Sequence, residues 1–248
     1  MKKIPILYVG APGIGKTAKV KSKYDYCEVL LLSSQTEEDI AGIPYQENGL
    51  EKRTIPPFVQ RLQKAKGSRC LFLDEIDKAR REVADTLLTL ITDQEKFGIP
   101  EDVEIIAAAN PPEWGGGDGV SIPMMNRFSI IESGVDIEGF SNYIIEKYGK
   151  NDFILSVLDS LKSGEMPILE ITGEGLNARL TSPRSIDYAL SALLFEKNEE
   201  KVIGLLTPNV ASGVMRLYRK ENNEETNLDN IQEMARIVST KKINPIRL

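Results

Sequence analysis

The sequence contains no histidine at any of its 248 positions. This absence excludes zinc sites of the histidine type, Ser-His-Asp triads and mechanisms in which an imidazole acts as the general base. Chemistry in this chain therefore has to use carboxylates, lysine, arginine, backbone amides or a bound ion.

Cysteine is almost as scarce, because Cys27 and Cys70 are the only two in the chain. Two thiols are too few for a metal cluster, and a chain of this length does not need a disulfide to stabilise its core. Both cysteines lie in apolar stretches that we expect to form strands. We interpret them as buried small hydrophobic residues of a protein in a reducing compartment.

The start of the sequence also lacks a long hydrophobic run. The apolar stretch Ile4–Val9 ends at Gly10, and it is too short for the core of a signal peptide or for a membrane span. We therefore expect a cytoplasmic protein with no membrane partner.

The remaining composition is that of an ordinary globular protein, with 41% hydrophobic and 27% charged residues. The length is sufficient for one large domain or two small ones with a substantial core. The 31 basic and 37 acidic residues give a net charge of −6. This charge argues against a protein that coats nucleic acid through bulk electrostatics.

The first half of the chain alternates short apolar runs with amphipathic stretches, which is the pattern of an α/β domain with a mostly parallel sheet. We assign strands where short apolar runs end at turn residues, and helices where apolar residues recur at helical spacing. The expected strands are Ile4–Val9, Glu28–Leu32, Cys70–Leu73, Val103–Ala109 and Phe128–Ile131. The expected helices are Lys16–Tyr24, Phe58–Ala65 and Ala79–Thr92.

From Asp136 onward the patterns are helical and strand signals are few. We therefore predict two domains, an α/β core over residues 1–134 and a mainly helical domain over residues 135–248, with Gly134 as the hinge. The expected helices of the second domain are Ile137–Tyr148, Asp152–Ser160, Pro183–Phe195 and Asn230–Val238.

The strongest motif is a glycine-rich segment between the first expected strand and the following helix. It matches the pattern G-x-x-x-x-G-K-[ST], whose glycines let backbone amides point at phosphate oxygens. Lys16 can reach the β- and γ-phosphates of a nucleotide, and the Thr17 hydroxyl can hold Mg²⁺. The segment expected to bind the nucleotide is Gly10-Ala11-Pro12-Gly13-Ile14-Gly15-Lys16-Thr17.

A second motif follows the third expected strand, where the apolar run Leu71–Leu73 leads into Asp74 and Glu75. In proteins with a phosphate loop, a carboxylate at such a strand end holds Mg²⁺, and Asp74 fits this role. Glu75 can then polarise a water toward the γ-phosphate. Two adjacent acids alone are also common at a helix N-terminus, so the combination with the phosphate loop is what indicates nucleotide hydrolysis.

Together these segments resemble an AAA+ ATPase, and most closely the MoxR branch of that family. Gly10–Thr17 is similar to the Walker A motif and Leu71–Glu75 to the Walker B motif of the family. Asn110, which ends the next strand before Pro111, takes the sensor 1 position, where the resemblance implies an amide that orients the attacking water. An asparagine before proline can also simply shape a turn.

The segment Met124–Phe128 resembles the D-R-F segment of this branch. The resemblance implies that Arg127 is an arginine finger, which reaches the nucleotide of the neighbouring subunit and stabilises charge on the transferring phosphoryl group. The branch usually carries aspartate where Asn126 stands. The alternative for Arg127 is a surface or salt-bridged residue.

The segment Thr181–Ser185 resembles the sensor 2 segment, which opens a helix of the lid domain. Ser182 suits the N-cap position of this helix, and Pro183 suits its first position. The resemblance implies that Arg184 faces the γ-phosphate from the lid, and the alternative is again a surface residue.

Two further segments favour the MoxR branch. Gln35–Gly42 resembles the stretch that follows its second strand, and Arg53–Phe58 resembles the exit of its inserted hairpin. Between them, Asn48-Gly49 is a strong signal for a two-residue hairpin turn. The resemblance implies that this hairpin faces the central pore of a ring. The segment Gln94–Val103 is shorter than the hairpin that members often carry before sensor 1.

The resemblance implies a Mg²⁺-dependent ATPase that binds ATP and forms a homo-oligomeric ring, expected to be a hexamer because Arg127 acts on a neighbouring subunit. It implies that hydrolysis remodels a partner protein or adaptor. Two alternatives stay open: an ATPase that acts on nucleic acid as a loader or viral DNA motor, and a nucleotide-gated assembly module with little turnover. The acidic composition counts against the first, and Glu75 counts against the second.

Overall fold

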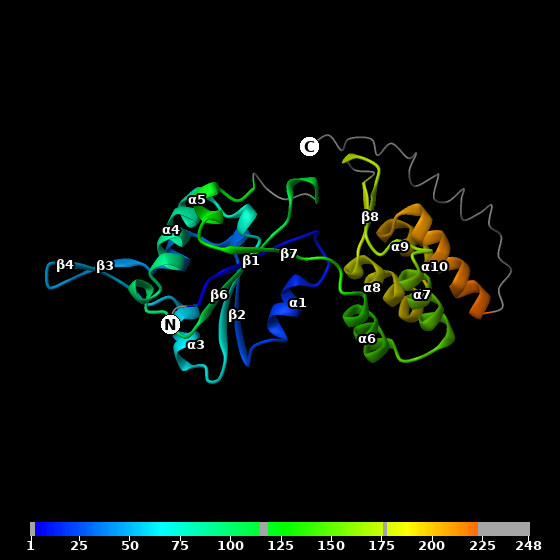
Figure 1. The fold of residues 1–248 in the computed structure, drawn as a ribbon, viewed down its shortest axis with the longest axis horizontal. Coiled ribbons are helices and arrows are strands. Elements are labelled where there is room, and N and C mark those ends of the chain that lie inside the picture. The colour runs from blue at the N-terminus through cyan, green and yellow to red at the C-terminus, as the bar shows by residue number, and fades with distance from the viewer. Residues whose placement is uncertain (1–2, 115–118, 176–177, 223–248) are drawn as a thin grey trace. The chain divides into compact units, whose positions relative to one another are not determined.

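The computed structural model describes residues 3–114, 119–175 and 178–222. The chain forms two compact units, residues 1–134 and 135–248 (Figure 1). Within the described ranges, no helix is long and apolar enough to cross a membrane. The expected helix Asn230–Val238 lies outside the described residues.

The first unit is built on a sheet of five parallel strands in the order β2-β5-β6-β1-β7. All five expected strands are present, with bounds shifted by one or two residues. Since the strands are parallel, the loops that follow β1, β5 and β6 emerge at the same edge of the sheet. The strands are β1 (Ile6–Val9), β2 (Tyr26–Leu31), β5 (Arg69–Asp74), β6 (Glu104–Ala109) and β7 (Ser129–Glu132).

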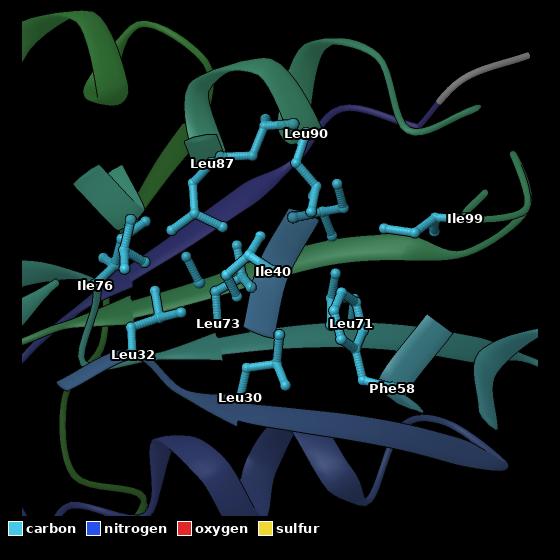
Figure 2. Packing of buried hydrophobic residues seen from close by; sticks show 14 of the residues in the cluster. Leu30, Leu32, Ile40, Phe58, Leu71, Leu73, Ile76, Leu87, Leu90 and Ile99 are labelled. Carbon is cyan, nitrogen blue, oxygen red and sulfur yellow. The ribbon is translucent and has the colours of Figure 1, made fainter. Parts of the chain in front are cut away.

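Helices cover both faces of this sheet, as the near-continuous apolar strands require. On one face Tyr8, Cys70, Phe72 and Ile106 pack with Val20 of α1 (Lys16–Lys21). The opposite face packs against four α-helices of the described residues, and Figure 2 shows its leucines and isoleucines interdigitating around Leu71 and Leu73. These helices are α2 (Glu37–Ala41), α3 (Pro57–Lys64), α4 (Arg81–Thr92) and α5 (Ile122–Met125).

Successive residues of β2 point to opposite faces of the sheet, and this decides which layer each side chain joins. Leu30 is buried in the second of these layers, whereas Cys27 faces the α1 side and is only half-buried. The expectation of two buried cysteines is therefore wrong for Cys27, because β2 is the end strand of the sheet and has a neighbour on one side only. Cys70, on the inner strand β5, is buried as predicted.

Helix α1 ends at Lys21 rather than at Tyr24. The amide of Ser22 still bonds to the carbonyl of Ala18 at 3.0 Å, but the amide of Tyr26 already pairs with Ser68 O at 3.1 Å. The chain leaves the helix early because Tyr26 must reach the sheet.

A two-stranded hairpin, β3 (Pro44–Glu47) and β4 (Leu50–Arg53), extends away from the sheet (Figure 1). Asn48 and Gly49 both have positive φ, 52° and 75°, which is the backbone of a type I′ turn. The turn predicted from this dipeptide is confirmed. Every residue of both strands is exposed.

The second unit is mainly helical around one core that includes Phe153, Ile186 and Met215. The predicted helix Ile137–Tyr148 is confirmed, and Asp152–Ser160 extends to Ser163. The elements are α6 (Ile137–Tyr148), α7 (Asp152–Ser163), β8 (Glu170–Thr172), β9 (Arg179–Thr181), α8 (Pro183–Ser191), α9 (Glu199–Leu205) and α10 (Pro208–Glu221).

Three parts of this unit differ from the sequence-based expectation. The hairpin of β8 and β9 was not expected, because strands of three residues carry little periodic signal. The expected helix Pro183–Phe195 is α-helical only to Ser191 and continues as a π-helical turn over Ala192–Glu196. Helices α9 and α10 were also missed.

A buried carboxylate fixes the end strand β2 to helix α3. Glu28 is 7% exposed and accepts hydrogen bonds from both Nε and Nη2 of Arg61, at 3.0 and 2.5 Å, and from the Tyr26 hydroxyl at 2.6 Å. Burial by itself would raise the pKa of Glu28, but the bonds from Arg61 and Tyr26 outweigh it and lower the pKa below its ordinary value of 4.5.

Glu28→Gln should lower the free energy of unfolding at pH 7 by about 1–3 kcal/mol, because the bidentate contact with Arg61 loses its charge. A depressed carboxyl pKa contributes stability above the unfolded-state value, and this contribution disappears as the pH falls through the native-state value. The wild type and the variant should therefore converge in urea denaturation below about pH 4.5. Glu51→Gln on the exposed hairpin is the control and should match the wild type throughout; a constant gap down to pH 2 would contradict the prediction.

Candidate functional site

The glycine-rich loop connects β1 to α1 and adopts a backbone that glycine permits. Gly13 and Gly15 have φ values of 77° and 91°, in the left-handed region that L-residues with side chains avoid. A Cβ at Gly10 would lie 2.3 Å from the carbonyl oxygen of Ser133. The glycines at the ends of the motif are therefore required by the local fold as well as by any ligand.

Lys16, the first residue of α1, has a nearly buried side chain that is 9% exposed. Its ammonium donates to the carbonyl oxygens of Gly10 and Ala11, at 2.7 and 2.9 Å, and to Oδ1 of Asn110 at 2.8 Å. These acceptors are neutral, so the positive charge has no carboxylate among these three contacts. Phosphate oxygens are stronger acceptors for a buried cation than carbonyls are.

A contact between Thr17 and Asp74 connects the glycine-rich segment with the acidic end of strand β5. The Thr17 hydroxyl donates to Oδ2 of Asp74, the last residue of β5, over 2.8 Å. A hydroxyl and a carboxylate are oxygen donors of the kind Mg²⁺ prefers, and this ion usually takes one or two protein ligands beside phosphates and waters. The pair fits such an ion, although the described residues contain no group of three or more acidic or cysteine ligands.

Glu75 follows in a strained conformation, with φ 54° and ψ 45° in the left-handed region. Its amide donates to Oδ1 of Asp74 at 3.0 Å, and its carboxylate accepts from Nζ of Lys78 at 3.2 Å. A residue with a side chain in this region costs about 1 kcal/mol, and such strain concentrates at functional sites. Because of this turn the neighbouring carboxylates of Asp74 and Glu75 reach different partners, Thr17 and Lys78.

Asn110 is held from two sides. Its side-chain oxygen accepts from Lys16, and its backbone amide donates to Oδ1 of Asp77 at 3.1 Å. Asp77 lies in the short 3₁₀ turn η2 (Ile76–Lys78) and is 5% exposed. The sequence analysis missed Asp77; the signal that was present is a third acid, three residues after Asp74, in a stretch that is otherwise apolar.

Arg127 lies against the C-terminal end of α4 in its own chain. Its Nε donates to the Leu88 carbonyl and the Thr92 hydroxyl, both at 3.0 Å, and Nη1 donates to the Pro123 carbonyl at 2.7 Å. A cation near the C-terminal end of a helix complements the helix dipole. The structure thus places Arg127 beside α4 and outside the cluster formed by Lys16 and Asn110.

Arg184 belongs to the second unit, in the first turn of α8, and is exposed. Ser182 caps this helix by accepting from the amide of Ser185 at 3.4 Å, with Pro183 at the first position. Both assignments made from the sequence are confirmed. The helix dipole disfavours a cation at a helix N-terminus, so the charge of Arg184 does not stabilise α8 through the dipole.

Comparison with known proteins identifies the family. The model of the AAA domain, dynein-related subfamily, matches residues 5–128. The chain belongs to the AAA+ family. The five-stranded parallel sheet with its phosphate loop is the α/β core of that fold. No curated protein matches the chain.

Among solved structures, two mutant forms of RuvB from Thermotoga maritima are similar. The identities are 15% and 14%, and the TM-scores are 0.43 and 0.44. The matches cover 86% and 90% of this chain, and 61% and 65% of the RuvB chains. This chain therefore spans less than two thirds of the length of those structures.

Asp77→Leu should lower the free energy of unfolding by about 1–3 kcal/mol, because the amide of Asn110 loses its acceptor in a partly buried position. Asp77→Asn is the matched variant, since it keeps the oxygen that accepts this bond, and should cost less than half as much. Equilibrium urea denaturation measures both. Equal losses for the two variants would show that the bond to Asn110 is not what Asp77 contributes.

Proposed function

We propose that this protein is a Mg²⁺-dependent ATPase of the MoxR-like branch, which works as a ring and remodels a partner protein. The observation that carries the proposal is the cluster of Lys16, Thr17, Asp74, Glu75 and Asn110, which three strand ends bring together. Each residue type has the chemistry that phosphoryl transfer to water requires.

In this proposal Lys16 exchanges its bonds to the loop carbonyls and to Asn110 for oxygens of the β- and γ-phosphates. The rest of the loop, Gly10 to Gly15, surrounds the phosphates and presents backbone amides to them, except at Pro12, which has no N–H, and at Gly10, whose amide donates to the Ala109 carbonyl at 3.2 Å. Thr17 and Asp74 hold Mg²⁺, directly or through water, which supplies charge neutralisation of the phosphates when bound. The short distance between their oxygens supports a shared ion.

Glu75 acts as the residue that polarises the attacking water. Its ion pair with Lys78 has to open for this, since the same carboxylate oxygen cannot serve both partners fully. Asn110 keeps its amide near the γ-phosphate because Asp77 anchors its backbone. Release of Asn110 by Lys16 on nucleotide binding frees its oxygen to orient that water.

We also propose residues 1–134 as the nucleotide-binding core and residues 135–248 as the lid. Arg184 would then act as the sensor 2 arginine, a role consistent with its exposure at an electrostatically unfavourable helix end. Arg127 would serve the neighbouring subunit of a ring, expected to be hexameric, after leaving its acceptors on α4. The exposed hairpin of β3 and β4 supports the MoxR assignment, because it is the insertion that the resemblance implied.

Lys16→Ala should weaken ATP binding by roughly 100-fold or more, because two charge-assisted bonds to phosphate are lost at about 1.5–3 kcal/mol each. Isothermal titration with ATP and Mg²⁺ measures this. Lys19→Ala removes an exposed lysine of the same helix and should bind normally. Normal binding by the Lys16 variant would overturn the assignment of the site.

Glu75→Gln should retain ATP binding and reduce turnover by roughly 10²–10⁴-fold, the range for loss of a general base. Phosphate release under saturating ATP is the measurement, and Lys78→Ala is the companion variant. Lys78 competes with water for the Glu75 carboxylate, so its removal should leave turnover equal to or above the wild type. Unchanged hydrolysis by the glutamine variant would reject the role of Glu75.

Arg127→Ala should reduce turnover by roughly 10³-fold only when subunits are assembled. Mixing it with Glu75→Gln should restore part of the activity, because some interfaces then combine an intact finger with an intact Glu75. Native mass spectrometry with one variant isotopically labelled establishes that mixed rings form. Thr92→Val, which removes one acceptor of Arg127 but keeps the guanidinium, is the control for a merely structural effect.

The mass of the purified protein with and without ATP and Mg²⁺ tests the ring itself. A shift from monomer to about six subunits supports the proposal that Arg127 acts on the nucleotide of the neighbouring subunit. A protein that binds ATP but stays monomeric, and whose ATPase rate rises with DNA at low salt, would favour the nucleic-acid alternative. Binding without turnover under every condition would favour the assembly module.

A further inference from the structure

Cys27 and Cys70 stand directly opposite each other on neighbouring parallel strands. The register of β2 and β5 pairs Cys27 with Cys70. Paired residues of parallel strands point to the same face of the sheet, and neighbouring strands lie about 4.8 Å apart. That spacing falls within the range of about 4.4–6.8 Å between the Cα atoms of disulfide-bonded cysteines.

The surroundings of the two thiols differ in a way that assigns them different roles. Cys70 is fully buried, beside Phe72 and Ile106 in the layer under α1. Cys27 is half-buried, because β2 is the end strand of the sheet. A small oxidant in solvent can therefore reach Cys27 but not Cys70.

The two sulfurs also perturb each other. The neighbouring Cys70 thiol lowers the pKa of Cys27 against the opposing effect of burial, and the positive charge of Lys21 lowers it further. Its position beside Cys27, together with burial, raises the pKa of Cys70. A thiolate is the nucleophilic form of cysteine, so the accessible sulfur is also the more reactive one, and the strand register places its partner directly opposite.

We propose that Cys27 and Cys70 are a site of reversible oxidation, at which a hydroperoxide converts the pair into an intramolecular disulfide between β2 and β5. This site is separate from the nucleotide-binding loop and does not depend on the function proposed for that loop. It gives a role to two residues for which the nucleotide chemistry has none.

The reaction has two balanced steps. The Cys27 thiolate attacks one peroxide oxygen, the O–O bond breaks, and a sulfenic acid forms while the other oxygen leaves and is protonated to water or alcohol. The Cys70 sulfur then attacks the sulfenic sulfur, the S–O bond breaks, and the hydroxyl leaves as water with the thiol proton. Two thiols lose two electrons in total, and the peroxide gains them.

The sheet geometry also predicts that the bond is easily reversed. Cβ atoms in a disulfide are about 3.8 Å apart, which is closer than the spacing of the strands, so the strands must draw together. Disulfides under such strain have more oxidising potentials and are reduced readily by thiols. Strand β5 also carries Asp74 at its carboxyl end. The ease with which the disulfide forms therefore also reports how rigidly β5 is held in the sheet.

The experiment exposes the full native chain to increasing hydrogen peroxide, blocks remaining thiols with an alkylating reagent after unfolding, and measures intact and peptide masses. We expect both thiols to be lost together, with a single peptide pair linking Cys27 to Cys70 and a protein mass lower by about 2 Da for two lost hydrogens. Dithiothreitol should return both thiols.

Two variants separate the roles of the sulfurs. In Cys70→Ala, Cys27 should form a sulfenic acid that dimedone traps, and then higher acids; in Cys27→Ala, Cys70 should stay reduced in the folded protein because it is buried. Thermal unfolding checks that each variant folds. If one variant does not fold, the peptide map of the wild type still shows whether Cys27 and Cys70 become linked.

Three results would overturn the proposal. One is oxidation of Cys27 in the wild type to sulfinic acid while Cys70 remains alkylatable. Another is a disulfide between two chains in place of the internal one, visible on a non-reducing gel. The third is complete resistance of both thiols at peroxide concentrations that oxidise free methionine added to the same solution.

Discussion

The arrangement of the loops at the carboxyl edge of the first unit's sheet depends on the hydrogen bonds that the buried ammonium of Lys16 donates. A cation that is 9% exposed must find acceptors, and it finds them on the loop after β1 and on Asn110 after β6. The contact joins the ends of β1 and β6 beside the backbone bond from the Gly10 amide to the Ala109 carbonyl at 3.2 Å. An anion that enters the loop has to compete with Asn110 for the same ammonium.

The order of the strands places the acidic side of the site. Because β6 lies between β1 and β5, Asn110 has Lys16 on one side and Asp77, from the turn after β5, on the other. Asp74 reaches back to Thr17 on α1. Basic and acidic groups are thus interleaved through hydrogen bonds, and the strained backbone of Glu75 turns its carboxylate to Lys78 instead of into this chain of bonds.

Strand β5 has a different chemistry at each end. Its carboxyl end carries Asp74, and near its amino end Cys70 faces Cys27 of β2. The pairing of the cysteines follows from the rule that residues in register on parallel strands share a face, whereas Asp74 contacts Thr17 of helix α1. The register of β5 with β2 places two sulfurs side by side, whereas the end position of β2 leaves one of them within reach of solvent.

Local signals were sufficient for much of this protein. The phosphate-loop glycines, the turn at Asn48, the cap at Ser182 and the five strands were all predicted, because each depends on residues close in sequence. Tertiary structure alone decided the strand order, the bond from Lys16 to Asn110, the anchor at Asp77, the docking of Arg127 on α4 and the pairing of the cysteines. Each of these joins residues dozens of positions apart, and periodicity along the chain carries no information about which strand becomes the neighbour of which.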